Sequence, residues 1–392
     1  MHAPSAPSTT APGAAELFQL LRDGRPRTRA ELAAVTGLAR STVAARVESL
    51  MAIGLVAPAG DAVSTGGRPP SQFALNPAAR LVIAVDLGAQ HGDVGIADLN
   101  GRILSRHREA MNIGGGPEHV LSWVLATVHD LLATMGRGTQ DLVGLGMGVP
   151  GPVEHETGRP SNPPIMPGWD GFDIPGWFSD RLPVPVFVDN DVNIMALGEH
   201  RVAWPDIKDL MLVKVATGIG SGIISSGMLQ RGGQGTAGDI GHIQVAHDRQ
   251  VLCRCGSTGC LEAVAAGPAI AGQLRIEGEA AETGMDVVEL ARAGNTAAIQ
   301  AVRQAGRALG EVLAICVNIV NPNVIAIGGA MAEAGEHLIA GVREVVYAKS
   351  MPLATRHLVI AQSKAGRDAG LIGAATLAAE HALSHTALES LL

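Results

Sequence analysis

Three cysteines within eight residues constrain this chain more than any other feature of its sequence. Cys253, Cys255 and Cys260 lie in the segment Gly238–Glu262, and His242 precedes them. Thiols crowded so closely are more typical of a metal site than of a disulfide framework. Three thiolates and one imidazole form a closed tetrahedral set that proteins use for structural zinc. We therefore predict that these four side chains bind a structural zinc ion.

Glycines and acidic residues of the same segment refine this interpretation. Gly256 and Gly259 allow the tight turns that bring neighbouring thiolates onto one ion. Asp239 and Glu262 flank the predicted ligands. A structural zinc needs no carboxylates beside its ligands, so we expect this loop to have a second function as well. The residues leave open that these are core thiols or a redox-sensing pair, with His247 as a rival nitrogen ligand.

The composition predicts a soluble globular protein with more than one domain. At 392 residues, 47 % hydrophobic and 17 % charged, the chain is long enough for two or three domains. It contains no apolar run of about 20 residues, so no membrane span is expected. The Pro-, Ala- and Thr-rich residues 1–13 are typical of a disordered leader rather than of a signal peptide. Cysteines used for metal rather than for disulfides fit a cytoplasmic protein.

Charge is distributed unevenly along the chain. Residues 1–80 contain eight arginines and five acidic residues, a net charge of +3, whereas the whole chain carries −8. The remaining 312 residues therefore carry −11. A small basic head on an acidic body indicates that only the head binds a polyanion.

The head, residues 14–80, has the pattern of a winged helix-turn-helix domain. Val43, Val47 and Leu50 recur at the spacing of one buried helix face. A glycine-bearing turn separates this helix from the one before it, as in a helix-turn-helix. The expected elements are helices over 14–22, 29–35 and 40–51, and two wing strands over 53–56 and 71–75.

The third helix of the head carries the side chains expected to contact double-stranded DNA. In helix-turn-helix domains this second helix of the pair enters the major groove. Arginines and hydroxyls suit contacts to phosphates and base edges, and an arginine at the wing tip suits a narrow minor groove. The alternative is a three-helix protein-binding module. The expected DNA contacts are Arg40, Ser41, Thr42, Ala45, Arg46 and, on the wing, Arg68.

The body, residues 81–392, alternates strand and helix patterns. Apolar, β-branched runs recur between helical segments, which predicts an α/β fold with mostly buried sheets. Strands are expected over 81–87, 94–97, 142–147, 184–188, 210–215, 223–225 and 324–327, and helices over 117–135, 193–200, 263–302 and 305–320.

Polar and glycine-rich segments follow several of these strands. Together the glycine segments predict backbone amides lining a phosphate or nucleotide cleft. Asn190 and Asp191 follow another strand, where they could bind sugar hydroxyls; the alternative is a strand-to-helix turn capped by Asp191 or Asn193. The residues predicted to face a nucleotide are Asp86 and Gly88, then Thr217, Gly218 and Gly220, then Gly328 and Gly329.

These motifs together resemble the ROK family of repressors, open-reading-frame products and sugar kinases. The resemblance spans the chain after its leader and is most specific in the cysteine segment. The winged head resembles that of the family's transcriptional regulators. The matching segments are 146–152, 190–193, 217–222, 237–242 and 253–262.

The resemblance implies a winged head on a two-lobed body of the actin/hexokinase (ribonuclease H-like) type. The first lobe would span 81–190 and be completed by a C-terminal helix over 370–392, and the second would span 191–369. Asn190, Asp191, Asp239, His242 and Glu262 would bind the sugar between the lobes. Asp191 is the general base in kinase members of the family, and His242 would place one ring nitrogen on zinc and the other toward sugar.

The chain departs from the kinase pattern at two positions that affect the predicted binding of sugar and ATP. Asp239 stands where the kinases have a glutamate, and Gly88 is followed by Ala89 and Gln90 instead of by glycine and threonine. A methyl group then lies where the backbone must approach phosphate, which argues against binding of ATP and Mg²⁺.

The leading hypothesis is a sugar-responsive repressor that binds an operator as a homodimer or homotetramer. The alternative is an ATP-dependent, glucokinase-like hexose kinase with Asp191 as its base, possibly also binding DNA. A metal or thiol-redox sensor is the third hypothesis.

Overall fold

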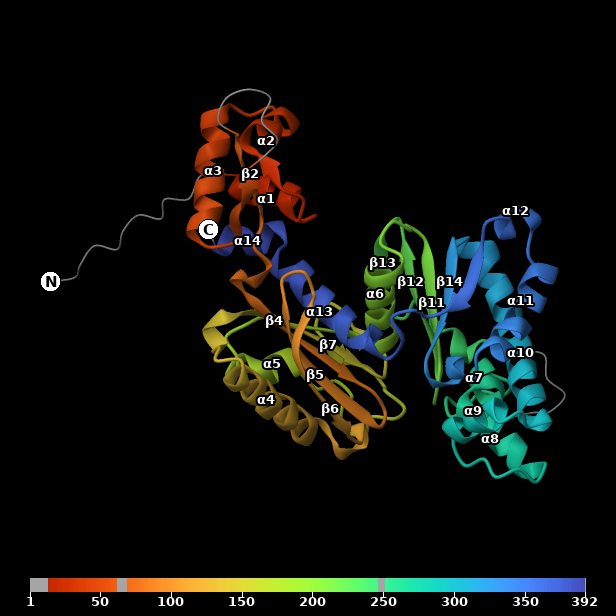
Figure 1. Cartoon of the computed structure of the whole chain (residues 1–392). Helices are drawn as coiled ribbons and strands as arrows, with labels where there is room; N and C mark the ends of the chain where they lie inside the picture. Colours follow the sequence, from red (N-terminus) through yellow and green to blue (C-terminus); the bar gives the residue numbers. More distant parts are fainter. Residues whose placement is uncertain (1–12, 62–68, 246–250, 392) are drawn as a thin grey trace.

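The chain forms a small head and a larger body that holds two five-stranded sheets (Figure 1). The computed structural model describes residues 13–61, 69–245 and 251–391. Three predicted features lie outside the described residues: residues 1–12 of the leader, the wing residue Arg68 and the rival ligand His247. No helix in the described part of the chain is long and apolar enough to cross a membrane.

The head has the three helices and the wing that its sequence predicts. Val43, Val47 and Leu50 are fully buried, as their spacing predicts. The first wing strand begins at Val56 instead of Ile53, because the Ile53 N–H still bonds to the end of the preceding helix. The elements are α1 (Ala14–Leu21), β1 (Arg27–Thr28), α2 (Arg29–Thr36), α3 (Arg40–Ala52), β2 (Val56–Asp61) and β3 (Ser71–Leu75), with sheet order β1-β3-β2.

The first lobe is a mixed sheet with helices on both faces. The strand Leu81–Leu87 is buried along its whole length, which explains its unbroken apolar sequence. The sheet order is β10-β7-β4-β5-β6, in which β4, β7 and β10 are parallel. Its elements are β4 (Leu81–Leu87), β5 (His91–Asp98), β6 (Ile103–Ala110), α4 (Pro117–Thr134), β7 (Leu142–Val149), β8 (Val153–Glu154), β9 (Arg159–Pro160), α5 (Ile174–Ser179) and β10 (Val186–Asn190).

The second lobe repeats this plan with sheet order β13-β12-β11-β14-β15. Alternate residues of β11 face different cores: Leu212 packs in the cluster that includes α6, and Met211 and Val213 pack in the cluster of α8 to α11. The elements are α6 (Asp191–Ala203), β11 (Leu210–Val215), β12 (Ile219–Ser225), β13 (Met228–Gln230), α7 (Leu261–Ala265), α8 (Gly267–Ile276), α9 (Gly284–Arg292), α10 (Thr296–Val320), β14 (Val324–Gly328), α11 (Glu336–Lys349), α12 (Pro352–Thr355) and β15 (Val359–Gln362).

One expectation for this lobe was wrong in detail. The helix predicted over 263–302 is divided into α7, α8, α9 and the start of α10, and a Thr283 capping box starts α9. The glycine segment after Thr217 is a tight turn followed by strand β12, which contains Gly220 and Gly222. A Cβ on Gly222 would lie 2.6 Å from the Cβ of Ala196, so this glycine lets the strand approach helix α6.

Helix α13 (Ala369–Ala382) joins the two lobes. It packs on β4 and β7 of the first sheet and on α6 of the second lobe. The α6–α13 contact is between backbones, because a Cβ on Gly198 would lie 1.9 Å from the Ala369 oxygen and one on Gly373 would lie 1.8 Å from the Ile194 oxygen. The C-terminal segment thus packs on the first lobe, but as two helices instead of one.

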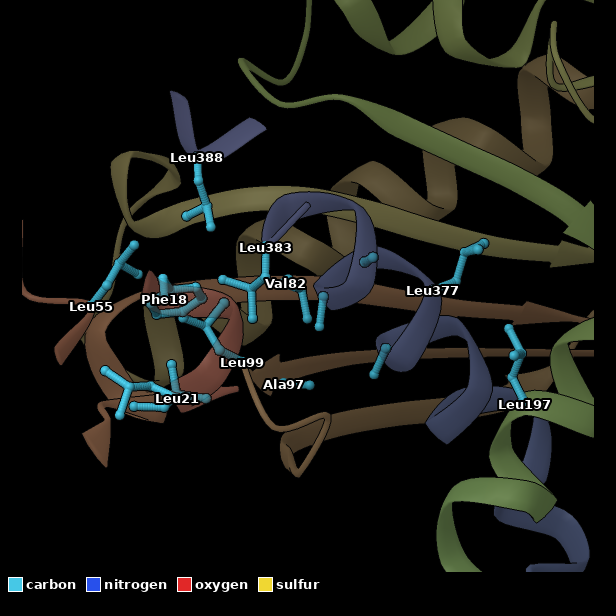
Figure 2. Packing of buried hydrophobic residues seen from close by; sticks show 14 of the residues in the cluster. Phe18, Leu21, Leu55, Val82, Ala97, Leu99, Leu197, Leu377, Leu383 and Leu388 are labelled. Atoms are coloured by element: carbon cyan, nitrogen blue, oxygen red, sulfur yellow. The ribbon is translucent and has the colours of Figure 1, made fainter. Parts of the chain in front are cut away.

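The second C-terminal helix, α14 (His385–Leu391), packs against α1 of the head. In the link between α13 and α14, the Leu383 carbonyl accepts a hydrogen bond from the Gln19 side chain of α1 at 2.9 Å. Figure 2 shows that Phe18 of the head lies close to Leu383 in an apolar cluster that continues along α13 to Leu197 of α6. One hydrophobic core therefore runs from the head to the helix that begins at Asp191.

Candidate metal centre and sugar-binding residues

The four predicted zinc ligands converge on one point. The ligand atoms of His242, Cys253, Cys255 and Cys260 all lie within 4.8 Å of one another. The Cys255 and Cys260 Sγ atoms are 3.7 Å apart, and His242 Nδ1 lies 3.6 Å from the Cys253 Sγ. A tetrahedral zinc with bonds of about 2.3 Å to sulfur separates its ligand atoms by about 3.8 Å. The geometry fits a closed four-ligand metal site.

The three thiols of this group lie in different surroundings. Burial raises the pKa of the Cys260 thiol to about 12, whereas hydrogen bonds from Ser257 lower the pKa of the exposed Cys255 thiol to about 7. Three thiolates this close repel one another unless a metal ion holds them. The donor set is therefore that of a metal centre, and the structure gives no support to isolated core thiols.

Positive φ angles at two glycines make the cysteine loop possible. Gly256 has a φ of 91° and Gly259 a φ of 74°, conformations that other residues rarely adopt. Across the first of these turns, the Cys253 N–H donates to the Ser257 carbonyl at 2.7 Å. Cys260 then serves as the residue before helix α7, so the metal loop leads directly into the α7–α10 core.

Asn190 and Asp191 lie where β10 of the first sheet meets α6. The Asn190 side chain caps the helix by accepting from the Val192 N–H at 2.9 Å, and its amide donates to the Gly151 carbonyl at 3.0 Å. Asp191 is 4 % exposed. The helix cap predicted at Asp191 or Asn193 is instead Asn190, because the helix begins at Asp191, and the contact of Asn190 with sugar stays a prediction.

Asp191 forms an ion pair with Lys214 of β11, which the sequence analysis missed. Burial raises the pKa of the Asp191 carboxyl, and the Lys214 ammonium opposes this effect. Burial lowers the pKa of Lys214, but the carboxylates of Asp191 and Asp86 raise it, and the net direction is upward. The signal in the sequence was a single charged residue in the apolar strand LMLVKV. A buried lysine needs an acidic partner close by.

The remaining sugar candidates lie at the metal loop. The Glu262 carboxylate and the His242 ring both act electrostatically on the Asp239 carboxyl, whose pKa is raised first by burial and then by Glu262. Because His242 presents Nδ1 to the thiols, its Nε2 is the nitrogen left for another partner. Glu262 also forms an ion pair with Arg254 at 3.3 Å.

The β11–β12 hairpin connects the two groups of sugar candidates. Lys214 on β11 holds Asp191, and the Ile219 N–H at the start of β12 donates to the Glu262 carboxylate at 3.2 Å. A Cβ on Gly218 would lie 2.6 Å from the same carboxylate oxygen. The predicted nucleotide residues Thr217 and Gly218 thus form the turn against which Glu262 packs.

The first glycine segment is filled by a side chain of the protein itself. A Cβ on Gly88 would lie 2.1 Å from the His91 ring, and that ring lies 3.7 Å from an Asp86 oxygen. The Ala89 carbonyl accepts a backbone hydrogen bond from Ile113, so the loop is a closed turn between β4 and β5. The His91 ring therefore fills the space beside Gly88.

The third glycine segment ends strand β14. Gly329 has a φ of 82°, and a Cβ there would lie 2.5 Å from the Val215 carbonyl oxygen. Gly328 pairs with Lys214 across the β11–β14 ladder. Both glycines therefore have structural roles that are independent of a nucleotide.

The recognition helix α3 presents most of its predicted DNA contacts to solvent. Arg40, Ser41 and Ala45 are exposed, and Thr42 is partly exposed. Arg46 differs, because it approaches Glu16 of α1 at 3.7 Å with its side chain only 13 % exposed. Glycine at position 13 makes room for its guanidinium.

A winged helix-turn-helix head on two α/β lobes, with a Cys₃His centre in the second lobe, defines a class of regulator that carries a sugar-kinase-like body. The ROK family profile matches residues 82–381, and a winged helix-turn-helix DNA-binding profile matches residues 17–57. The chain belongs to the ROK family and has a winged helix-turn-helix head.

Relatives include both regulators and kinases. The xylose repressor of Bacillus spizizenii is 28 % identical, over 94 % of each chain. A ROK family transcriptional regulator, a homologue of the Escherichia coli MLC protein, superposes with a TM-score of 0.82 over 98 % of each chain at 24 % identity. A ROK family glucokinase from Streptomyces griseus, solved with glucose and AMPPNP, superposes with a TM-score of 0.65 at 28 % identity over 76 % of this chain and 99 % of that one.

Proposed function

We propose that this protein is a sugar-responsive transcriptional repressor. The observation that carries the proposal is the continuous apolar core that joins the head to helix α6, which begins at the candidate sugar residue Asp191. The name of the xylose repressor, which aligns along 94 % of this chain, supports the same function. Asn190, Asp191, Asp239, His242 and Glu262 would bind the sugar.

DNA binding is assigned to the exposed face of α3. Arg40, Ser41, Thr42 and Ala45 would enter the major groove, where the first residues of a recognition helix contact base edges. Arg46 is left out, because Glu16 already neutralises it. Arg68 keeps its predicted minor-groove role, although it lies outside the described residues.

Sugar occupancy would reach the head through α13. A sugar held by residues of both lobes favours one arrangement of α6 against α13, because backbone contacts at Gly198 and Gly373 leave no soft side chains between the helices. Movement of α13 displaces Leu383 and α14, which pack on the head. The head would then lose the orientation that the operator requires.

The metal centre would hold structural zinc. Four protein ligands leave no open coordination position, so zinc would fold the loop and orient His242 and take no part in catalysis. One zinc per chain should therefore be measured by elemental analysis. Cys255→Ser should lower this content, whereas Cys316→Ser should not, because Cys316 lies apart in α10.

A homodimer would form through an exposed apolar surface at the ends of α10 and α12. Ile319, Met351 and Leu353 are 77 %, 67 % and 75 % exposed, and the Met351 N–H bonds to the Asn318 side chain of α10. A second copy is the proposed occupant, because one head reads one half-site and operators for such heads are paired half-sites. Leu353→Asp should halve the mass in light scattering, and an unchanged mass or a wild-type monomer would reject this interface.

The kinase alternative retains one supporting observation, the fold shared with the Streptomyces griseus glucokinase. Against it, the His91 ring fills the space beside Gly88, and Asp191 is already bound to an ammonium group. A coupled assay for ADP release across hexoses tests it. Steady sugar-dependent turnover that Asp191→Asn abolishes would favour the kinase.

The test of the repressor is selection of a DNA sequence by the purified full-length protein, followed by fluorescence anisotropy with the selected duplex. Arg40→Ala should weaken binding, and xylose, glucose or N-acetylglucosamine should lower the affinity of the wild type. Asp239→Asn should reduce the sugar response while leaving DNA affinity intact, because Asp239 lies far from the head in sequence. Failure to select any sequence, or DNA affinity unmoved by every sugar tested, would refute the proposal.

A further inference from the structure

Lys214 is the one charged residue of strand β11, and its position in the sheet is unusual. Neighbours in register on adjacent strands point to the same face of a sheet. Lys214 pairs with Gly220 of β12 on one side and with Gly328 of β14 on the other. Neither neighbour has a side chain, so the lysine stem lies alone in this row.

This row faces helix α6. A Cβ on Gly220 would lie 3.2 Å from the Val192 side chain, and one on Gly328 would lie 3.5 Å from Met195. Lys214 on the same face reaches Asp191, the first residue of that helix, with Nζ bonded to Oδ2. The glycines that the sequence assigned to a phosphate cleft thus border a fixed ammonium group.

The Lys214 ammonium is bonded to Asp191 and also acts electrostatically on a second carboxylate, Asp86. Asp191 follows β10 of the first sheet, and Asp86, near the end of β4, also acts electrostatically on Lys214 and on Asp191. Sites that transfer phosphoryl groups bring cations to such carboxylates as metal–nucleotide complexes. Here the strand itself supplies the positive charge.

We propose that Lys214 is a specificity-determining residue of the sugar site. In a kinase, a bound metal–nucleotide complex would bring positive charge to these carboxylates, and here the Lys214 ammonium provides that charge. The same contact keeps Asp191 as a hydrogen-bond acceptor for free sugar. The inference rests on the proposed function, because it assigns a role within the same sugar site. It makes the site bind a sugar that no nucleotide accompanies.

The chemistry of Asp191 follows from this contact. A general base must accept a proton with a free lone pair and a suitable proton affinity. The ammonium bonded to Oδ2 occupies that oxygen, and it opposes the effect of burial, which raises the pKa of Asp191. The same ionised oxygen pair still accepts hydrogen bonds from sugar hydroxyls. Binding without phosphoryl transfer is the expected outcome.

The experiment compares the full-length wild type with Lys214→Met, Lys214→Arg and the control Lys208→Met, which removes an exposed lysine just before β11. Sugar affinity is measured by calorimetry from pH 5.5 to pH 8, with and without millimolar MgCl₂ and ATP. Wild type and Lys208→Met should bind sugar equally with and without Mg-ATP, and Lys214→Arg should retain this behaviour.

Lys214→Met should bind sugar about tenfold more weakly at low pH and recover as pH rises. The sign follows from burial, which raises the pKa of Asp191 once its cation is gone, so the carboxylate form is lost as pH falls. The charged groups that act on Asp191 among the described residues are Lys214 of β11 and Asp86 of β4. The wild type should show a smaller change over the same range.

A second readout needs no sugar. MgCl₂ should raise the thermal unfolding temperature of Lys214→Met, whose two carboxylates lack a cation, and should leave the wild type unchanged. If no sugar binds the wild type, the proposed function fails, and this Mg²⁺ response alone decides the role of Lys214.

Three results would overturn the inference: wild-type sugar affinity that rises with Mg-ATP, sugar-dependent ADP release by the wild type, or Lys214→Met that binds like the wild type and ignores Mg²⁺. If Lys214→Met does not fold, the response of the wild type and of Lys214→Arg to Mg-ATP decides the question.

Discussion

Glu199 of α6 is a buried carboxylate that bonds to the loop preceding α13. It is fully buried, and it accepts four hydrogen bonds. Oε1 accepts from the Trp204 indole at 3.1 Å and from the Lys364 N–H at 3.0 Å. Oε2 accepts from the Ser363 hydroxyl at 2.6 Å and from the Ala365 N–H at 2.9 Å. These bonds fix the loop that leads into α13.

Glu199→Gln keeps the shape and removes one acceptor and the charge. The glutamine side chain can adopt two orientations. In the less costly one, its NH₂ group takes the place of Oε2, and the Ser363 hydroxyl rotates to accept a hydrogen bond from it. The Ala365 N–H then faces another donor, which costs about 1–3 kcal/mol, and the two bonds to the other oxygen lose their charge assistance. The expected destabilisation is about 3 kcal/mol, reduced somewhat because a neutral amide costs less to bury.

Denaturant unfolding followed by tryptophan fluorescence measures this loss, since Trp204 is itself a partner of Glu199. Ser363→Ala should cost about 1 kcal/mol, because it removes a single donor. The control Glu282→Gln, on a side chain that is 78 % exposed, should change stability by less than about 0.5 kcal/mol. A Glu199→Gln protein within about 1 kcal/mol of the wild type would refute the reasoning.

Three further predictions follow from the contacts described. Gly329→Ala should destabilise the protein by about 2 kcal/mol or more, because Gly329 has a positive φ and a Cβ there would lie 2.5 Å from the Val215 oxygen. The control Gly233→Ala should be near neutral, because a Cβ there would meet nothing within 4 Å. Urea unfolding midpoints of the two variants measure the difference. Burial lowers the pKa of His381 and His155, so the stability they confer is present above their unfolded pKa and is lost as pH falls below about 6.5. His381→Gln should therefore flatten the fall in unfolding temperature between pH 7.5 and pH 5.5, and an unchanged slope would contradict this assignment. A zinc chelator should lower the thermal stability of the wild type, and no effect despite measured loss of metal would argue against a structural role for the ion.

Local spacing explains which features the sequence could predict. Cys253, Cys255 and Cys260 lie so close in the chain that two glycine turns suffice to bring them together. The winged head is similarly local, because its helices are short and their buried residues follow one period. Glycines are harder to interpret, because the same residue can serve a ligand or a close packing contact. Gly222, inside the glycine segment 217–222, lies in a strand that packs closely on Ala196.

The sequence by itself determined which four side chains converge in the candidate metal site, where the third helix of the head lies, and how strands and helices alternate, since each depends on residues close to one another in the chain. Only the tertiary structure decided which charges meet: Lys214 neutralises Asp191, and Arg46 turns to Glu16. It also decided that α13 joins both lobes to the head. Such contacts connect residues far apart in the chain, and their energies depend on burial and distance, which no local pattern encodes.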